Sequence, residues 1–106
     1  MPKFLIHGSY TAEGLKGLLR EGGTGRRAAI EKLTESLGGR LEAIYYAFGE
    51  DDVYVIGDFP DYVTAAAVCL AAGASGAVRT NTTLLLTPEE IDEATRKSVD
   101  YRPPGG

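Results

Sequence analysis

The sequence predicts an α+β fold in which helices cover one face of an antiparallel β-sheet. Four stretches rich in β-branched and aromatic residues are interspersed with stretches whose apolar residues recur at helical spacing. Two of the predicted strands are joined by the short acidic turn 49–52, which makes them an antiparallel hairpin. A length of 106 residues with 43% hydrophobic residues suits one domain with a single core.

The N-terminal part contains one strand and two helical segments. Residues 3–10 alternate along a strand that is apolar on both faces, which is typical of a central strand. Thr11 is placed to cap a short helix over residues 12–20. The glycine-rich stretch 21–25 interrupts the helical pattern, which resumes over residues 26–37 and ends at a glycine pair.

The rest of the chain supplies three strands and two helices. Strands are predicted over three stretches: 40–48, 53–59 and 77–86. Between the last two lies a helix over residues 61–73, whose inward face we expect to consist of Val63, Ala66, Ala67 and Leu70. A final helix starts with Thr87 as cap, Pro88 as first residue and Glu90 as the capping-box partner. We therefore expect one domain over residues 1–98 and a C-terminal tail over residues 99–106.

This element order predicts both a topology and a partner. A β-α-β-β-α-β core is the ferredoxin-like arrangement, in which the helices cover only one face of the sheet. The first and third predicted strands nevertheless carry apolar or aromatic residues on both faces. Because the chain has nothing left to cover the second face, we expect the chain to form a homodimer through it.

Composition excludes several classes of function. A net charge of −4 argues against a nucleic-acid partner and against an anionic-membrane partner, because both need a basic surface. The sequence has no apolar run of the roughly 20 residues needed to span a membrane and no signal-peptide pattern, so a cytoplasmic protein is expected. The single cysteine, Cys69, lies in an apolar helical run and is expected to be a buried structural thiol. The sequence predicts no metal site and implies no cofactor.

A series of short motifs resembles one known family. The motifs occur in the order Glu21-Gly22-Gly23-x-x-Arg26-Arg27, Leu37-Gly38-Gly39, Tyr46-x-Phe48-Gly49, Asp52, Pro60-Asp61, Ser75-Gly76-Ala77-Val78-Arg79, Leu86-Thr87-Pro88-Glu89-Glu90 and Tyr101-Arg102-Pro103-Pro104-Gly105. Over nearly its whole length the chain is thus similar to GYD-domain proteins, small bacterial and archaeal proteins. The resemblance implies a ferredoxin-like, dimeric α/β-barrel fold, and no established activity comes with it.

One departure from the family pattern lies in the acidic turn. The name-giving motif is Gly, any residue, Tyr, Asp, and the chain reads Gly49-Glu50-Asp51-Asp52. Asp51 therefore stands at the tyrosine position. Any chemistry that depends on this tyrosine in relatives would be absent from this chain, whereas a tyrosine that only packs at the turn would be replaceable.

Alternation along the strands predicts a polar set on the uncovered sheet face. His7, Ser9, Tyr54 and Asp58 are expected to share that face as candidate site residues. Four further residues are candidates to join them: Arg79, Asn81 and either Tyr45 or Tyr46. A few polar groups among apolar ones are typical of a small-molecule site.

His7 is the candidate catalytic residue because it is the only histidine in the chain. With Asp58 orienting it and Tyr54 binding an oxyanion, His7 as general base would suit proton abstraction next to a carbonyl. Two alternatives are a hydrogen-bonded structural histidine and a haem ligand, since some dimeric α/β barrels bind haem through one histidine.

Two other motifs have a structural and a functional interpretation. The glycine run before Arg26-Arg27 is either a mobile connector or an anion site at a helix start. The acids Glu50, Asp51 and Asp52 form either a solvated turn or a site for a hard cation.

The sequence is compatible with two functions from different classes. The first is a small-molecule enzyme or binding protein with its site inside a dimeric barrel, carrying out proton-transfer chemistry or cofactor-independent oxidation. The second is a non-catalytic homo-oligomeric interaction or regulatory module, in which the tail 99–106 clamps a neighbouring subunit.

Overall fold

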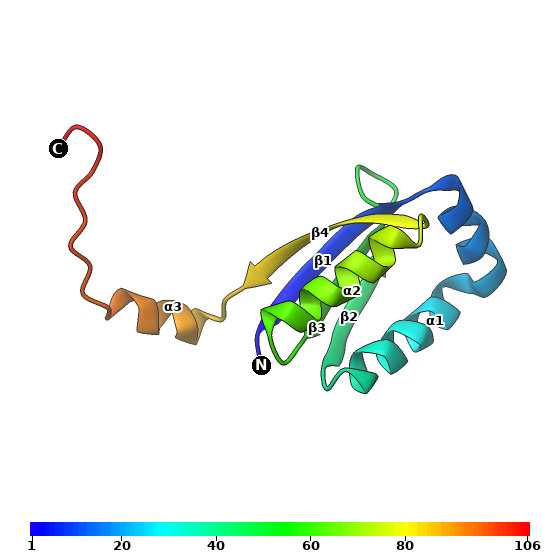
Figure 1. The fold of residues 1–106 in the computed structure, drawn as a ribbon, viewed down its shortest axis with the longest axis horizontal. Helices are drawn as coiled ribbons and strands as arrows, with labels where there is room; N and C mark the ends of the chain where they lie inside the picture. The colour runs from blue at the N-terminus through cyan, green and yellow to red at the C-terminus, as the bar shows by residue number, and fades with distance from the viewer.

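The computed structural model describes residues 1–106 and contains four strands and three helices (Figure 1). Their bounds are β1 Lys3–Tyr10, α1 Ala12–Ser36, β2 Arg40–Tyr46, β3 Val53–Asp58, α2 Tyr62–Ala74, β4 Val78–Leu85 and α3 Pro88–Thr95. Every strand and helix expected from the sequence is present, with ends that differ by one or two residues except within α1.

The four strands form one sheet in the order β2-β3-β1-β4, and every neighbouring pair is antiparallel. The prediction of an α+β fold with an antiparallel sheet is therefore confirmed. β1 is central and is hydrogen-bonded to β3 on one side and to β4 on the other. Figure 1 shows α1 and α2 on the same face of the sheet, with the opposite face free of helices.

The glycine-rich stretch after residue 20 is a kink and not a loop. Helical structure runs from Ala12 to Ser36, and only Gly22 leaves it, with φ 80° and ψ 165°. A positive φ is costly for residues with a side chain, so glycine is the residue that permits this bend. The two helices predicted for this region are thus two halves of α1 that meet at Gly22.

The caps predicted at Thr11 and Thr87 are confirmed, and Asp61 caps the start of α2 in the same way. The backbone N–H of Gly14 donates to Thr11 Oγ1 at 3.2 Å, and that of Thr64 donates to Asp61 Oδ1 at 2.7 Å. Thr87 and Glu90 form the reciprocal capping box, in which each side chain accepts the other's backbone N–H. These contacts satisfy N–H groups that a helix start leaves without a partner.

The core is small and lies between α2 and the sheet. Phe4, Phe59 and Ala65 form its centre, with Ile6 and Val68 packed against them. The inward face predicted for α2 is wrong, because Val63 is 78% exposed and Leu70 is 74% exposed. The residues of α2 that face the sheet are Ala65 and Val68 with their half-buried neighbours. Only nine of the 106 residues are buried, which is few for a domain of this length.

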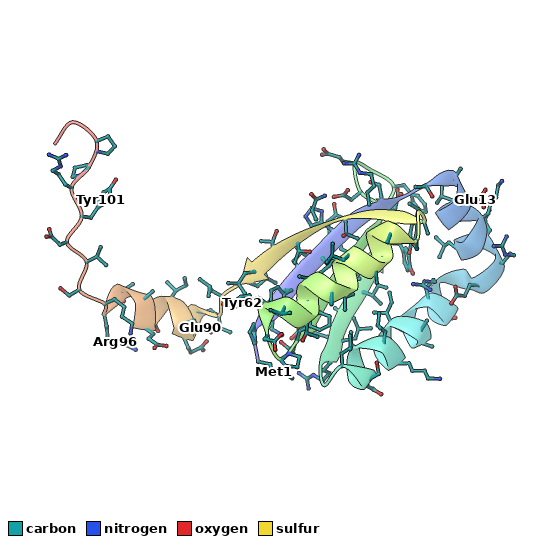
Figure 2. All side chains as sticks on the ribbon, in the orientation of Figure 1. Met1, Glu13, Tyr62, Glu90, Arg96 and Tyr101 are labelled. Atoms are coloured by element: carbon teal, nitrogen blue, oxygen red, sulfur yellow. The ribbon has the colours of Figure 1, made fainter.

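The chain after β4 projects away from the sheet. In Figure 1, α3 and the residues after it extend to one side of the body, and Figure 2 places Arg96 and Tyr101 far from both other helices. The radius of gyration is 16.8 Å, against about 13 Å for a compact domain of this size. We call residues 87–106 the C-terminal arm.

None of the three helices has both the length and the apolar character that a membrane crossing requires.

Two glycines give opposite expectations for substitution by alanine. A Cβ on Gly17 would have no atom within 4 Å, so Gly17→Ala should raise the free energy of unfolding by about 1 kcal/mol through helix propensity. A Cβ on Gly8 would clash with the Arg79 carbonyl oxygen, so Gly8→Ala should lower the free energy of unfolding by about 1–3 kcal/mol. Urea unfolding of both variants measures this, and equal effects would contradict the close approach of β4 to Gly8.

Candidate functional site

The uncovered face of the sheet, which we call the open face, carries side chains from all four strands. The antiparallel register pairs His7 with Tyr54 and Asn81, and pairs Ser9 with Arg79. Because directly paired residues point to the same side of a sheet, these side chains share one face. The remaining open-face residues are Lys3, Leu5, Arg40, Glu42, Ala43, Tyr45, Ile56, Asp58, Thr83 and Leu85.

His7 is held by a carboxylate from the acidic turn. Its Nδ1 lies 2.5 Å from Asp51 Oδ2. The side chains of His7 and Asp51 are only 24% and 17% exposed, so the contact is partly shielded from water. With Nδ1 engaged by the carboxylate, Nε2 is the ring nitrogen left for another partner.

Two neighbours fix this pair in place. The rings of His7 and Tyr54 are stacked, with centroids 5.6 Å apart and planes 11° from parallel. The Ser9 hydroxyl is 3.1 Å from Asp51 Oδ1 and 2.9 Å from the Glu50 carbonyl oxygen. The second carboxylate oxygen of Asp51 is therefore also hydrogen-bonded, which limits its rotation.

Backbone contacts bring the acidic turn over the end of β1. The Asp52 N–H donates to the Gly8 carbonyl at 2.8 Å, and the Tyr10 N–H donates to Asp52 Oδ2 at 2.9 Å. Asp52 is therefore a structural acid that extends the sheet pairing. With Asp52 anchored to β1, the preceding residue, Asp51, reaches His7.

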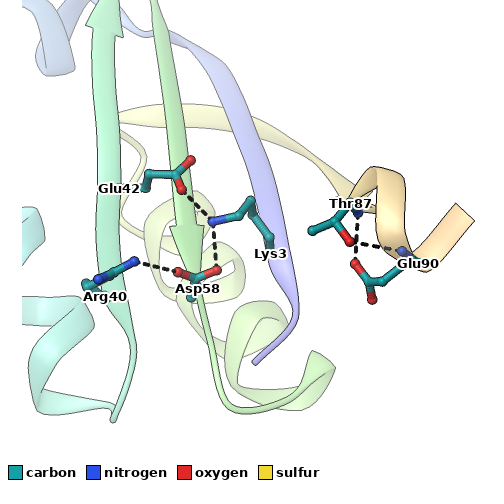
Figure 3. A network of polar contacts seen from close by, with 6 residues as sticks. All are labelled: Lys3, Arg40, Glu42, Asp58, Thr87 and Glu90. Carbon is teal, nitrogen blue, oxygen red and sulfur yellow. Dashed lines mark hydrogen bonds and ion pairs between the residues drawn. The ribbon is translucent and has the colours of Figure 1, made fainter. Parts of the chain in front are cut away.

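The prediction that Asp58 orients His7 is wrong. Asp58 does lie on the same face as His7, but at the far end of β3, where it pairs with Lys3 at 3.0 Å and with Arg40 at 3.8 Å. Glu42 completes this network by accepting from Lys3 at 2.7 Å, as Figure 3 shows. Asp51, and not Asp58, is the carboxylate that orients His7.

The structure also corrects the placement of Tyr46. The register pairs Tyr45 with Tyr54 and Tyr46 with the buried Val53, so Tyr45 lies on the open face and Tyr46 beneath the helices. A β-bulge between Leu41 and Ala43 shifts the register of β2. Alternation alone cannot locate a bulge, and this uncertainty left both tyrosines as candidates.

The sequence reasoning missed Asp51 as a partner of His7. Period-2 alternation applies within a strand and gives no direction for a turn residue. The one signal in the sequence is that Asp51 occupies the tyrosine position of the family motif. The last two candidates, Arg79 and Asn81, are exposed on the open face beside Ser9 and His7.

This arrangement is suited to moving a proton. A carboxylate on Nδ1 holds the imidazole so that Nε2 can accept a proton, and it stabilises the imidazolium that results. The Arg79 guanidinium lies on the next strand and supplies a positive charge for an anionic oxygen.

The chain has no group of three or more His, Cys, Asp or Glu side chains that could hold a metal ion. Cys69 is half-buried, with Sγ 3.0 Å from Thr82 Oγ1 on the helix side of β4.

The contact between His7 and Asp51 makes stability depend on acid pH. The hydrogen bond from His7, with a smaller contribution from Ser9, holds the pKa of Asp51 below its ordinary value of 3.8. A lowered pKa means that the contact stabilises the fold above pH 3.8 and is lost as the pH falls through the lowered value. Asp51→Asn should therefore be less stable than the original chain near neutral pH, and this difference should shrink in acid.

Urea unfolding at several pH values measures that difference. Glu50→Gln, a change to the neighbouring exposed acid, should show no such pH-dependent difference. A constant gap between Asp51→Asn and the original chain across the acid range would contradict the pairing with His7.

Comparison with known proteins agrees with the motifs found in the sequence. The family model of the GYD domain matches residues 4–95, which include all four strands and α3. No curated protein and no solved structure matches the chain. The match covers most of the 106 residues, and the chain belongs to the GYD-domain family.

Proposed function

We propose that this GYD-domain protein binds a small carbonyl compound on the open face and transfers a proton through His7. In this proposal, two copies pair through their open faces as a ferredoxin-like, dimeric α/β barrel that encloses the site. The observation that carries the proposal is the contact between His7 and Asp51, in which a carboxylate orients the only histidine of the chain on a sheet face that no helix covers.

The substrate class follows from the groups around the free ring nitrogen. Asn81 is paired directly with His7, and Arg79, two residues away on β4, is the next residue on the same face. Both donate hydrogen bonds, and Arg79 favours a carboxylate or an enolate oxygen. A small 2-oxo or 3-oxo carboxylate would place its acidic C–H near Nε2 and its oxygens near these donors.

Exchange of carbon-bound hydrogen tests this chemistry without knowledge of the full reaction. In deuterated water, the protein should accelerate loss of the proton signal next to the carbonyl of a simple oxo acid such as acetoacetate. His7→Ala should reduce the protein-catalysed rate by about 100-fold or more, the usual contribution of a general base. Asp51→Asn should also reduce it, because the ring loses its orientation.

Glu50→Gln is the matched control, since Glu50 is an exposed neighbour in the same turn. Its exchange rate should equal that of the original chain. An absence of exchange across a panel of 2-oxo and 3-oxo acids would contradict the proton-transfer proposal.

The uncovered apolar surface supports pairing of two copies. The open face contains Leu5, Ile56 and Leu85 together with two tyrosines, and no helix of the chain covers it. With few residues buried in the single chain, a second copy would add the core that the fold lacks.

A carboxylate introduced into the open face or into the exposed side of α2 tests which of these two surfaces forms the dimer interface. Ile56→Asp should convert the dimer to a monomer, because an unpaired carboxylate would be buried between the sheets. Val63→Asp, on the exposed side of α2, should leave the dimer intact. Light scattering coupled to size exclusion measures both masses, and the opposite outcome would place the interface on the helices.

A second candidate function is supported by the C-terminal arm. Three apolar residues on the arm have no packing partner in the core and are well exposed: Ile91, Val99 and Tyr101. An arm of this kind suits a non-catalytic module that assembles by clamping a neighbouring copy. Deletion of residues 99–106 should then weaken self-association, which dilution in analytical ultracentrifugation would detect; an unchanged association constant would contradict this role.

A further inference from the structure

A second cavity lies on the helix side of the sheet, away from the open face. α1 packs on β2 and α2 on β4, and the two helices make no extended contact with each other. The gap between them is a cleft of about 710 Å³. Its apolar walls include Leu18, Leu33 and Leu37 from α1 and Val68 and Ala72 from α2.

The cleft continues inward to the sheet. A smaller cavity of about 130 Å³ is lined by Ile6, Val55 and Phe59 beneath the helices. Leu33 and Val68 line both spaces, so the two adjoin. Together they form an apolar site of a size suited to a small ligand.

Polar groups converge at one side of this apolar site. Arg26 and Tyr10 line both the cleft and the inner cavity. Arg26 has a single ion pair, to Glu21 at 3.5 Å, and its side chain is only 36% exposed. A guanidinium has five N–H donors, so this pair leaves most of its hydrogen-bonding capacity unused.

Tyr46 lines a neighbouring pocket that shares Leu18 with the cleft, and its hydroxyl is the unexplained group beside the site. It is buried and has no hydrogen-bond partner in the chain. Burial, with a further contribution from Tyr10, raises the pKa of Tyr46 to about 12, while the nearby positive charge of Arg26 acts in the opposite direction. The phenol is protonated near neutral pH, and it lies close to Tyr10 and Arg26 without a hydrogen bond of good geometry to either. An unpaired buried donor is costly and requires an explanation.

We propose that the cleft between α1 and α2 binds a small apolar carboxylate. Its chain or ring would lie against the leucines of α1 and the small side chains of α2. Its carboxylate would accept hydrogen bonds from Arg26 and from the Tyr46 hydroxyl. The side chains of this site lie on the side of the sheet opposite the His7 side chain, because the strands alternate, although His7 also lines the inner cavity.

The chemistry of the walls favours this ligand over a phosphate compound. A phosphate needs several donors for its charge, whereas the two arginines that line the cleft, Arg20 and Arg26, are accompanied by two acids, Glu13 and Glu21. Of the two arginines, only Arg26 also lines the inner cavity. The kink at Gly22 separates Glu21 from the half of α1 that carries Arg26. Arg26 can thus exchange its weak contact with Glu21 for a ligand carboxylate.

Isothermal titration with octanoate and with octan-1-ol tests the carboxylate requirement. The two probes have the same chain length and differ in the charged group. Octanoate should bind about tenfold or more tightly than the alcohol, since a charged hydrogen bond contributes about that much to affinity. Equal affinities, or no binding of octanoate, would overturn the proposal.

Variants assign the binding to the named groups. Arg26→Gln should weaken octanoate binding about tenfold, and Tyr46→Phe should weaken it severalfold while leaving the unfolding midpoint unchanged or higher. Arg27→Gln is the matched control, because Arg27 is 56% exposed and pairs with Glu31 along the same helix. Equal losses for the two arginine variants would overturn the assignment.

His7→Ala separates this site from the open face. The variant should bind octanoate with the affinity of the original chain, even where it abolishes hydrogen exchange at a carbonyl compound. A loss of octanoate binding in His7→Ala would overturn the placement of the ligand between the helices.

Discussion

The structure depends on the central position of β1, which is hydrogen-bonded along both edges. β3 pairs with it over residues 3–8 and β4 over residues 3–10. Successive side chains of a strand point to opposite faces, so β1 divides the molecule into two layers. Phe4 and Ile6 enter the layer beneath the helices, and Leu5 and His7 point to the open face. The helices cover the first set and leave the second uncovered.

The candidate site follows from the way the chain returns to β1. The hairpin between β2 and β3 ends with Asp52, whose backbone and side chain both bond to the end of β1. That anchoring turns Asp51 toward His7 and Ser9. The altered residue of the family motif is therefore not a solvated surface acid. It supplies the carboxylate that gives the only histidine of the chain a defined orientation.

The two sides of the sheet have different chemical character. The open face is a shallow polar and aromatic surface around His7, and it would be enclosed only if a second copy covers it. The helix side has an apolar cleft because α1 bends at Gly22 and packs on β2, away from α2. The same strands thus carry two separate candidate sites, with Tyr45 on one face of β2 and Tyr46 on the other.

The sequence by itself determined the α+β class, the strands and helices with nearly correct ends, and the caps at Thr11 and Thr87. These features arise from periodicity and from hydrogen bonds within one turn of helix, so neighbouring residues contain the information. Alternation also put His7, Ser9 and Tyr54 on one face, which the register shows. The family was likewise recognisable from motifs in order.

Only the tertiary structure decided the partners of these residues. The bulge in β2 set the face of each tyrosine, the return of the hairpin over β1 brought Asp51 to His7, and strand length separated Asp58 from it. The His7–Asp51 contact joins residues 44 positions apart, and β1 and β4 pair across still longer separations. Register and turn direction result from hydrogen bonds between distant segments, and no local pattern in the chain contains that information.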